Sequence, residues 1–265
     1  MKKKTFSRLS GCYLAFLLVV MYLPVLMVII YSFNQSKSDV QWTGFTLDWY
    51  QRMVRDQSLM DALRNSLIVA VSSCAVSAVI GTIGAVGLAR WDFRAKGLIE
   101  NAAMLPIMVP EIILGMVFLA FFSFLGLPFG MLTLIIAHTT FCIPYIFIVV
   151  KGRLAGIDKS IGEAARDLGA SSMRMFFDIT LPLIAPGVVS GTLLAFAMSL
   201  DDVVISFFVT GAQTNTLPIK IYSQIKLGVT PEINALCTVM LALTFLLIFI
   251  AGRIGNTTKR IKKRR

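Results

Sequence analysis

The sequence predicts an all-α membrane protein with six transmembrane helices. Hydrophobic residues make up 57% of the chain, charged residues only 15%, and the mean hydropathy is +0.79. A soluble domain carries about 25% charged residues. A disordered chain is poor in hydrophobic residues, so both classes are excluded. Six apolar segments each approach the ~20 residues that a helix needs to cross roughly 30 Å of hydrocarbon.

The six expected spans are separated by short polar segments and by two long ones, residues 34–64 and 151–182. In chain order, the expected spans are residues 12–33, 65–89, 102–124, 131–150, 186–209 and 235–254. The first span follows three lysines, as a signal peptide would. Its apolar run is longer than a usual signal peptide's, and no small-x-small cleavage site follows it. We therefore expect an uncleaved span and one integral-membrane domain over residues 1–265.

The positive charges predict that both termini are cytoplasmic. Cytoplasmic loops are enriched in Lys and Arg. With both termini inside, nineteen of the 25 Lys and Arg fall in cytoplasmic segments. They cluster at the two ends of the chain and after the second and fourth spans. This distribution also explains the net charge of +11, so no nucleic acid is expected as a partner.

Cysteine and histidine give no sign of a metal site. Cys12, Cys74, Cys142 and Cys237 lie in apolar stretches without a C-x-x-C pair, which is typical of small buried side chains rather than disulfides or zinc ligands. His138, the single histidine, also lies in an apolar run. We interpret it as an interhelical hydrogen-bonding group.

Two expected spans carry small residues at four-residue spacing, which places them on one helix face. They are Ser73, Ser77, Gly81, Ala85 and Ala89 in the second span, and Gly187, Gly191, Ala195 and Ser199 in the fifth. Helices in lipid associate closely through such faces, so a tight bundle or a seam with another membrane subunit is expected. Pro106, Pro110 and Pro144 predict kinks in the third and fourth spans.

The long outer segment, residues 34–64, contains aromatic residues that suit a membrane interface. Trp42, Phe45, Trp49 and Tyr50 lie within it. Trp and Tyr are enriched where membrane meets water, so this segment is interpreted as an interfacial amphipathic helix. A docking face for an external partner is the alternative.

The long inner segment reads as two short helices. Glu163, Ala164 and Ala165 fall in the first, and Gly169 supplies its stop. The second crosses residues 173–178, and Leu181-Pro182 is expected to break it before the fifth span. A compact helix pair at this place is suited to carry force from a soluble partner.

The same segment resembles the EAA motif of binding-protein-dependent ABC importer permeases. The motif is E-A-A-x3-G-x9-I-x-L-P, and its seven defined positions are Glu163, Ala164, Ala165, Gly169, Ile179, Leu181 and Pro182. The resemblance implies the type I importer permease (MetI-like) fold. It also implies that residues 151–182 form the coupling-helix loop, which inserts into a cleft of a cytoplasmic ATPase subunit.

Further stretches resemble the spermidine/putrescine (polyamine) branch of that family. They are residues 44–50, 64–67, 199–204, 208–211, 217–222 and 231–236. This resemblance implies a non-catalytic permease subunit of the bacterial inner membrane that works by alternating access. Its implied partners are a second permease, two ABC ATPase subunits, a periplasmic binding protein and membrane lipid. No cofactor is expected on this chain, which has no G-x-x-x-x-G-K-[ST] loop, and ATP with Mg²⁺ would be used by the ATPase.

Three acids fall inside the expected spans and are the candidate substrate-pathway residues: Glu111, Asp201 and Asp202. A charge at the helix centre costs about 2.5 to 3.5 kcal/mol to insert, so these side chains should face a cavity or a partner, or be protonated. Carboxylates would offset the desolvation of a polycation. The two adjacent aspartates point about 100° apart on an ideal helix, so both face one ammonium only if the helix is broken. One of them capping a helix start is an equally natural role.

Other features of the pathway and of the function stay open. Tyr145, Phe141 and Phe207 are equivalent candidates for a pathway aromatic. A related importer for another solute is the first alternative function. A membrane transferase that holds Mg²⁺ on Asp201-Asp202 is disfavoured because no third acid follows at helical spacing. A stand-alone secondary transporter is disfavoured by the absence of an internal repeat.

Overall fold

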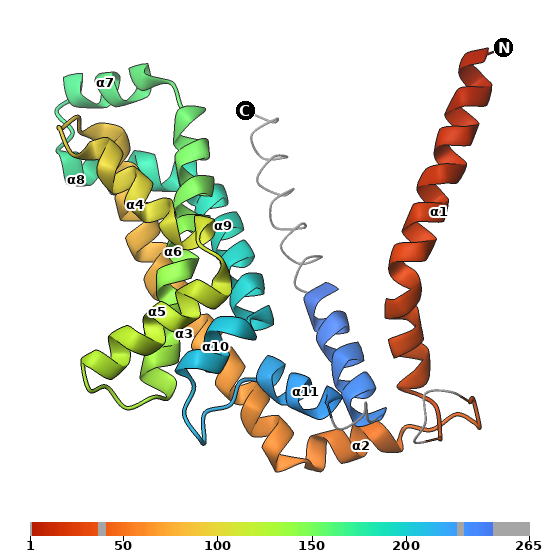
Figure 1. Cartoon of the computed structure of the whole chain (residues 1–265). Helices are drawn as coiled ribbons and strands as arrows, with labels where there is room; N and C mark the ends of the chain where they lie inside the picture. Colours follow the sequence, from red (N-terminus) through yellow and green to blue (C-terminus); the bar gives the residue numbers. More distant parts are fainter. Residues whose placement is uncertain (1, 37–40, 227–230, 246–265) are drawn as a thin grey trace. The chain divides into compact units, whose positions relative to one another are not determined.

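The computed structural model describes residues 2–36, 41–226 and 231–245, and its regular elements in these ranges are all helical (Figure 1). The chain divides into two compact units, residues 1–60 with 223–265, and residues 61–222. Among the described residues, four helices are long and apolar enough to cross a membrane: Gly11–Tyr31, Gln57–Arg90, Met131–Ala155 and Ser172–Asp201. A bent helix pair would make a fifth span, and Pro231–Phe245 is a shorter apolar helix.

The first unit contains α1 (Lys2–Tyr31), α2 (Asp48–Arg55) and the helix Pro231–Phe245. The indole N–H of Trp49 donates to the Asn34 carbonyl at 2.6 Å, and the Ser32 and Tyr50 hydroxyls lie 2.7 Å apart. These bonds tie α2 to the end of α1. The expected helix in the outer segment is therefore present as α2. The sixth expected span beyond Phe245 and the C-terminal basic residues lie outside the described residues.

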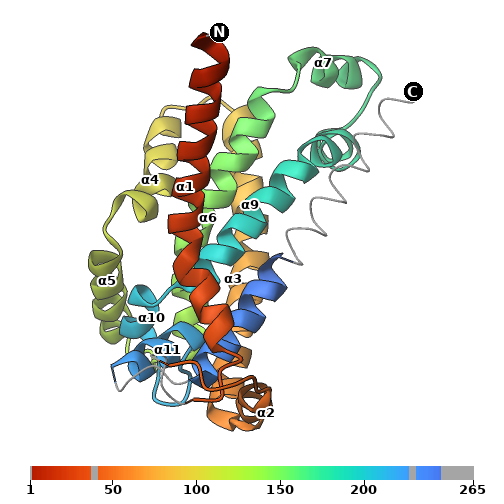
Figure 2. The same cartoon turned by 90° about the vertical axis from the view of Figure 1, so that its right-hand side faces the viewer.

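The second unit is built around α6 (Met131–Ala155), which lies beside α9 (Leu181–Asp201) in Figures 1 and 2. Gly191 of α9 approaches α6 so closely that an added Cβ would lie 3.0 Å from the Ile146 Cα. Gly81 of α3 (Gln57–Arg90) meets the same residue from another side, with an added Cβ 3.2 Å from the Ile146 Cβ. The two small-residue faces expected from the sequence thus both pack on α6, which confirms a tight bundle.

Proline 144 is accommodated inside α6. Its ring removes one backbone donor from the helix. The Ser77 hydroxyl of α3 donates to the Thr139 carbonyl at 2.9 Å, about one turn before the proline. The bond thus lies next to the disturbed turn, where the carbonyl left without its helical N–H donor is that of Thr140.

The expected third span is not one helix. α4 (Lys96–Met108) and α5 (Glu111–Phe124) meet at an angle of 108°. Val109 is extended at φ −81° and ψ 133°, because the ring of the following proline disfavours the α conformation there. Pro106 lies within α4, so the break itself is at Val109-Pro110.

The expected fifth span is also interrupted. α9 ends at Asp201, Asp202 is extended at φ −67° and ψ 121°, and α10 (Val204–Val209) begins after it. α10 packs on α5. An added Cβ at Gly115 of α5 would overlap the Phe208 ring, so the close contact of these helices needs a glycine there. α11 (Leu217–Ile225) follows, and the Leu217 N–H donates to the Ser66 hydroxyl of α3 at 2.8 Å.

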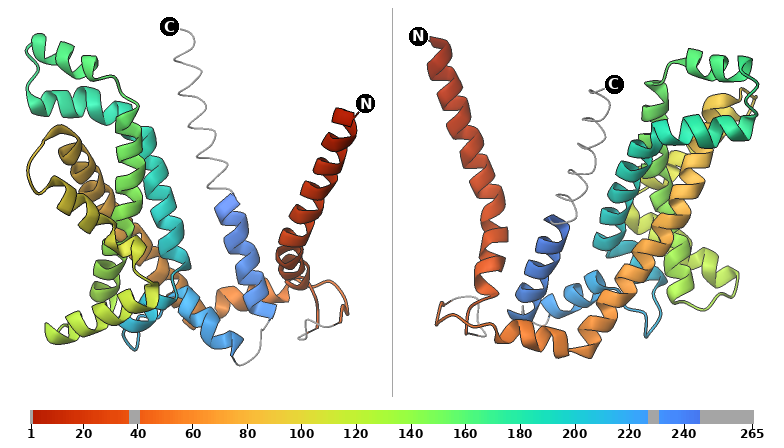
Figure 3. Two further views of the ribbon diagram at one scale, coloured as in Figure 1. Left: turned by 45° about the horizontal axis from the view of Figure 1, so that its top comes forward. Right: turned by 180° about the vertical axis from the view of Figure 1, so that it is seen from behind.

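The segment of residues 151–182 folds as α7 (Lys159–Asp167) and α8 (Ser172–Met175), which are green in Figure 3, and a π-helical turn, η1 (Phe176–Thr180), follows. Gly169 has φ +79°, which confirms its predicted role in ending the first helix. The expected break at Leu181-Pro182 is wrong. The Leu181 N–H bonds to the Phe176 carbonyl, and helix runs on without a break from Ser172 to Asp201. Pro182 stands in the first turn of α9, where a missing N–H costs little.

Candidate functional site

Two groups of predicted site residues lie at different places in the second unit. One is the helical hairpin of α7, α8 and η1, which lies beyond the end of α6 in Figure 1. The other is a cavity beside the α9–α10 break, lined by residues of α6, α9 and α10 and by two residues near the α4–α5 break.

The seven motif residues are spread over the hairpin and the start of α9. Glu163, Ala164 and Ala165 lie on α7, where Asp158 caps the helix by accepting the Ser160 N–H at 2.9 Å. Ala165 is 6% exposed, whereas Glu163 and Ala164 are exposed. Gly169 forms the turn to α8, Ile179 lies in η1, and Leu181 with Pro182 begins α9.

Apolar side chains on this hairpin point to water in the isolated chain. Leu168 is 89% exposed, Met173 70% and Phe177 55%. An apolar surface at the polar end of a membrane bundle, rimmed by charged residues, is typical of a protein-contact site.

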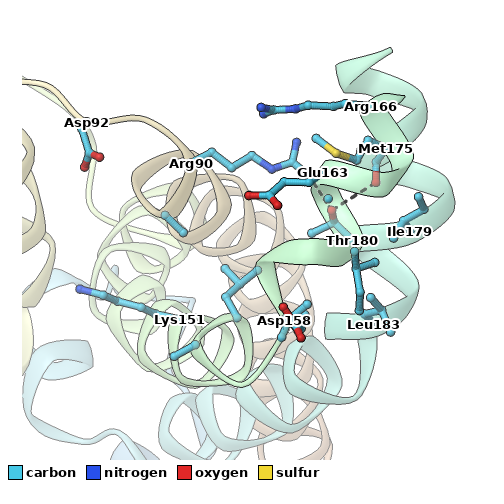
Figure 4. A pocket seen from close by; sticks show the side chains of 16 residues that line it. Arg90, Asp92, Lys151, Asp158, Glu163, Arg166, Met175, Ile179, Thr180 and Leu183 are labelled. Atoms are coloured by element: carbon cyan, nitrogen blue, oxygen red, sulfur yellow. Dashed lines mark hydrogen bonds between the residues drawn. The ribbon is translucent and has the colours of Figure 1, made fainter. Parts of the chain in front are cut away.

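A cavity of about 540 Å³ lies between the hairpin and the C-terminal ends of α3 and α6 (Figure 4). Arg90, Lys151 and Arg166 line it together with the acids Asp92, Asp158 and Glu163. The Arg90 guanidinium donates to the Thr180 hydroxyl of η1 at 2.5 Å. The hairpin is thus bonded directly to the end of α3. Sequence reasoning could not single out Arg90, because its partner is 90 residues further along the chain.

The second cavity, of about 210 Å³, collects the three acids that the sequence singled out. Glu111, Asp201 and Asp202 all line it. Among the candidate aromatics, Tyr145 and Phe141 line it as well, whereas Phe207 is 62% exposed and is not among the lining residues. Pro106, Met198, Val203, Val204 and Ile205 complete the wall.

Of these acids, Asp202 accepts the most hydrogen bonds within the protein. Its Oδ2 accepts the Ser206 N–H at 2.7 Å and the Ser206 hydroxyl at 2.6 Å, and its Oδ1 accepts the Ile205 N–H at 3.2 Å. These are the N-terminal donors of α10, so the carboxylate caps that short helix. The helix-capping alternative is therefore correct for Asp202, and the break it makes brings both aspartates to one cavity.

His138 of α6 completes the arrangement. Its Nδ1 lies 2.8 Å from the Ser199 hydroxyl of α9, and its Nε2 lies 2.9 Å from the Ser206 hydroxyl of α10. Its Nε2 also lies 3.5 Å from the Asp202 Oδ2. The prediction of an interhelical hydrogen-bonding group is confirmed. The two serines were missed as its partners, since Ser199 had been assigned only to the packing face.

These features define an all-helical, multi-pass membrane protein with a helical hairpin exposed at one end of its bundle. Residues 77–257 match the family described as "Binding-protein-dependent transport system inner membrane component". The chain belongs to this family of inner-membrane transport components, which transport rather than catalyse.

Relatives and solved structures agree with this assignment. The chain is 40% identical over 248 residues to the spermidine/putrescine transport system permease protein PotC of Escherichia coli (strain K12), covering 94% of each chain. It is 43% identical to the putrescine transport system permease protein PotI of the same organism, covering 87% of this chain and 85% of PotI. These similarities confirm the predicted resemblance to polyamine permeases.

The fold is that of importer permeases. A bacterial ABC transporter involved in the import of the acidic polysaccharide alginate matches with a TM-score of 0.75 at 15% identity, over 97% of both chains. The MetNI methionine ABC transporter, in inward-facing conformations, matches with a TM-score of 0.62 at 21% identity, over 80% of this chain and 99% of that one.

Proposed function

We propose that this chain is the transmembrane subunit of an ATP-driven importer that moves polyamines across the bacterial inner membrane. A periplasmic binding protein delivers the substrate, and this chain and a second permease alternate between outward and inward access. PotC and PotI, the relatives at 40% and 43% identity, are named for spermidine and putrescine transport. The observation that carries the proposal to this chain is the cavity lined by Glu111, Asp201 and Asp202.

The chemistry of that cavity suits an organic cation. Carboxylates in a low-dielectric wall attract an ammonium group strongly, because little water screens the charges. Tyr145 and Phe141 add aromatic faces, which also attract cations. An importer for an acidic solute would gain nothing from acids at this place.

The topology follows the charge distribution. The chain crosses the membrane six times with both termini in the cytoplasm. The end of α3 at Arg90, the end of α6 at Lys151 and the α7 hairpin all line one cavity, which supports placing these connections on the same side. The exposed hairpin then faces the cytoplasm, where the ATPases are.

The hairpin is the coupling element. Glu163, Ala164, Ala165, Gly169, Ile179, Leu181 and Pro182 form or support the part that enters a cleft in the ATPase subunit. ATP and Mg²⁺ are bound by that subunit. The continuous helix from Ser172 to Asp201 favours this role, since a movement of α8 is carried along one rigid element to the acid cavity.

Uptake of labelled putrescine and spermidine tests the proposal. The assay uses cells lacking this chain and complemented with wild type, Glu111→Gln, Asp201→Asn or Asp61→Asn. Asp61 is exposed on α3 and does not line the acid cavity, so its variant is the matched control. With substrate below KM, wild type and the control should restore uptake, and the two cavity variants should restore much less.

Recruitment of the ATPase subunit to the membrane is measured in the same cells. It should be equal in all variants, because none of them alters the hairpin. If wild type recruits the ATPase but restores no polyamine uptake, the importer assignment stands and the polyamine substrate is refuted.

A further inference from the structure

The adjacent aspartates differ in almost every local property. The Asp202 side chain is 5% exposed, and both of its oxygens accept hydrogen bonds. Asp201, by contrast, is exposed. Within residues 2–36, 41–226 and 231–245, its carboxylate takes part in no hydrogen bond or ion pair. The two neighbouring acids of one cavity therefore differ: the carboxylate of Asp202 is occupied by hydrogen bonds within the protein, and that of Asp201 is available to a ligand.

The hydrogen bonds around Asp202 have a fixed direction. An ionised carboxylate only accepts, so the Ser206 hydroxyl donates its proton to Asp202 at 2.6 Å. That hydroxyl has one hydrogen, so toward His138 it can only accept. The Nε2 of His138 therefore carries the hydrogen donated at 2.9 Å. In the neutral ring, Nδ1 then accepts from the Ser199 hydroxyl at 2.8 Å.

The resulting chain of donors runs from Ser199 through His138 and Ser206 to Asp202. It joins α9, α6 and α10 across the point where the backbone is extended. His138 is 0% exposed, so the middle of this hydrogen-bond chain is protected from water. Fully satisfied polar networks in a low dielectric hold their members in one geometry. Cargo that bonded Asp202 would have to compete with donors that are already in place.

We infer that the two aspartates have separate tasks, with Asp201 and Glu111 forming the subsite for a primary ammonium group and His138 acting as the positioning residue that fixes Asp202 and the α9–α10 break. This inference rests on the proposed function. An ammonium has three donors, and the two exposed carboxylates offer acceptors for them. The apolar wall of Pro106, Phe141 and Met198 suits the methylenes that follow the ammonium.

The volume fits one end of the cargo. At roughly 30 Å³ for each water, the cavity of about 210 Å³ corresponds to about seven waters. That space takes an ammonium group with its first methylenes. The rest of a triamine such as spermidine would extend beyond this cavity.

Transport kinetics in the assembled importer separate the two tasks. Asp201→Asn should raise KM for putrescine by about tenfold or more, because a charge-assisted bond to the cargo is lost. His138→Leu fills the same space without hydrogen bonds, and Ser206→Ala cuts the link while leaving its backbone N–H. Both should lower the maximal rate and leave KM within about threefold. His138→Gln keeps a donor at the Nε2 position and should restore much of the rate.

The inference fails if His138→Leu transports as well as wild type, since packing alone would then explain the histidine. It also fails if Asp202→Asn raises KM while Asp201→Asn leaves it unchanged. A double variant of His138→Leu with Ser206→Ala should be no worse than either single variant, because both interrupt one chain.

Thiol labelling tests the division without any assumption about the cargo. In the assembled complex, with the four native cysteines replaced by alanine, Asp201→Cys should react with a small maleimide at least about tenfold faster than Asp202→Cys, because thiol reactivity follows exposure. Equal labelling would overturn the inference even if polyamine uptake is confirmed. If labelling is unequal but no polyamine is taken up, the separate roles of Asp201 and Asp202 are supported and the proposed polyamine substrate is refuted.

Discussion

The seam between α6 and α9 gives the sharpest test of the packing. A Cβ added at Gly191 would lie 3.0 Å from the Ile146 Cα, 3.3 Å from the Val149 Cβ and 3.5 Å from the Ile146 carbonyl oxygen. The nearest atom belongs to the backbone, so no rotamer change relieves the contact. The two helices must separate by a few tenths of an ångström, and overpacking of this kind costs about 1–3 kcal/mol.

Gly152, which is on α6 itself, supplies the matched control. A Cβ added there meets nothing within 4 Å. Gly→Ala within a helix gains up to about 1 kcal/mol from backbone propensity, and this gain is common to both sites. The free energy of unfolding of Gly191→Ala should therefore fall about 1–3 kcal/mol below that of Gly152→Ala.

Thermal unfolding of the complex purified in detergent measures this difference. For a chain of this size, 1 kcal/mol corresponds to about 2–4 °C in Tm, so Gly191→Ala should melt roughly 2–12 °C below Gly152→Ala. Equal midpoints, or a higher midpoint for Gly191→Ala, would refute the close approach of α9 to α6.

Three further predictions follow from single contacts. Gly211→Ala should reduce folded, membrane-inserted protein several-fold on a fluorescence-detected sizing column, because its Cβ would overlap the Phe129 carbonyl; normal yield would contradict that contact. Leu168→Glu should lower ATPase recruitment at least about tenfold without changing Tm, since this apolar side chain is 89% exposed, and normal recruitment would remove Leu168 from the contact surface. The Ser160 N–H holds the pKa of Asp158 below its ordinary value, so the cap stabilises α7 at neutral pH and is lost as the pH falls through that lowered pKa. The protection factors of the α7 amides, which compare exchange with the intrinsic rate at each pH, should therefore fall at low pH in wild type but not in Asp158→Asn. Identical pH profiles of protection would contradict the cap.

The acid cavity and the hairpin are connected by one helical element. From Ser172 to Asp201 the chain is helical without a break, and the π-turn of η1 shifts the hydrogen-bond register within it. Such π segments are frequent at functional sites. Arg90 bonds to Thr180 of η1, so the hairpin contacts α3 as well as leading into α9.

Local sequence determined the helical class, at least four helices apolar and long enough to cross a membrane, and the hairpin motif. Apolar runs of about 20 residues have few alternatives to helix in lipid, because every backbone polar group must be satisfied internally. The four-residue spacing of Gly187, Gly191, Ala195 and Ser199 likewise defines a close-packing face without reference to its partner. Gly169 was predictable as a helix stop for the same kind of reason, since a positive φ favours glycine.

Tertiary structure alone decided where the helices break and which of the two adjacent aspartates is exposed. Pro182 looked like a helix breaker, yet it lies in a first turn that a π-turn supplies with bonds. Asp201 and Asp202 are equivalent in the sequence, and only the donors of Ser206 and the buried His138, 64 residues away from Asp202, make one a helix cap and leave the other exposed. The physical reason is that a carboxylate's state depends on the donors around it, and those donors come from segments that only the fold brings together.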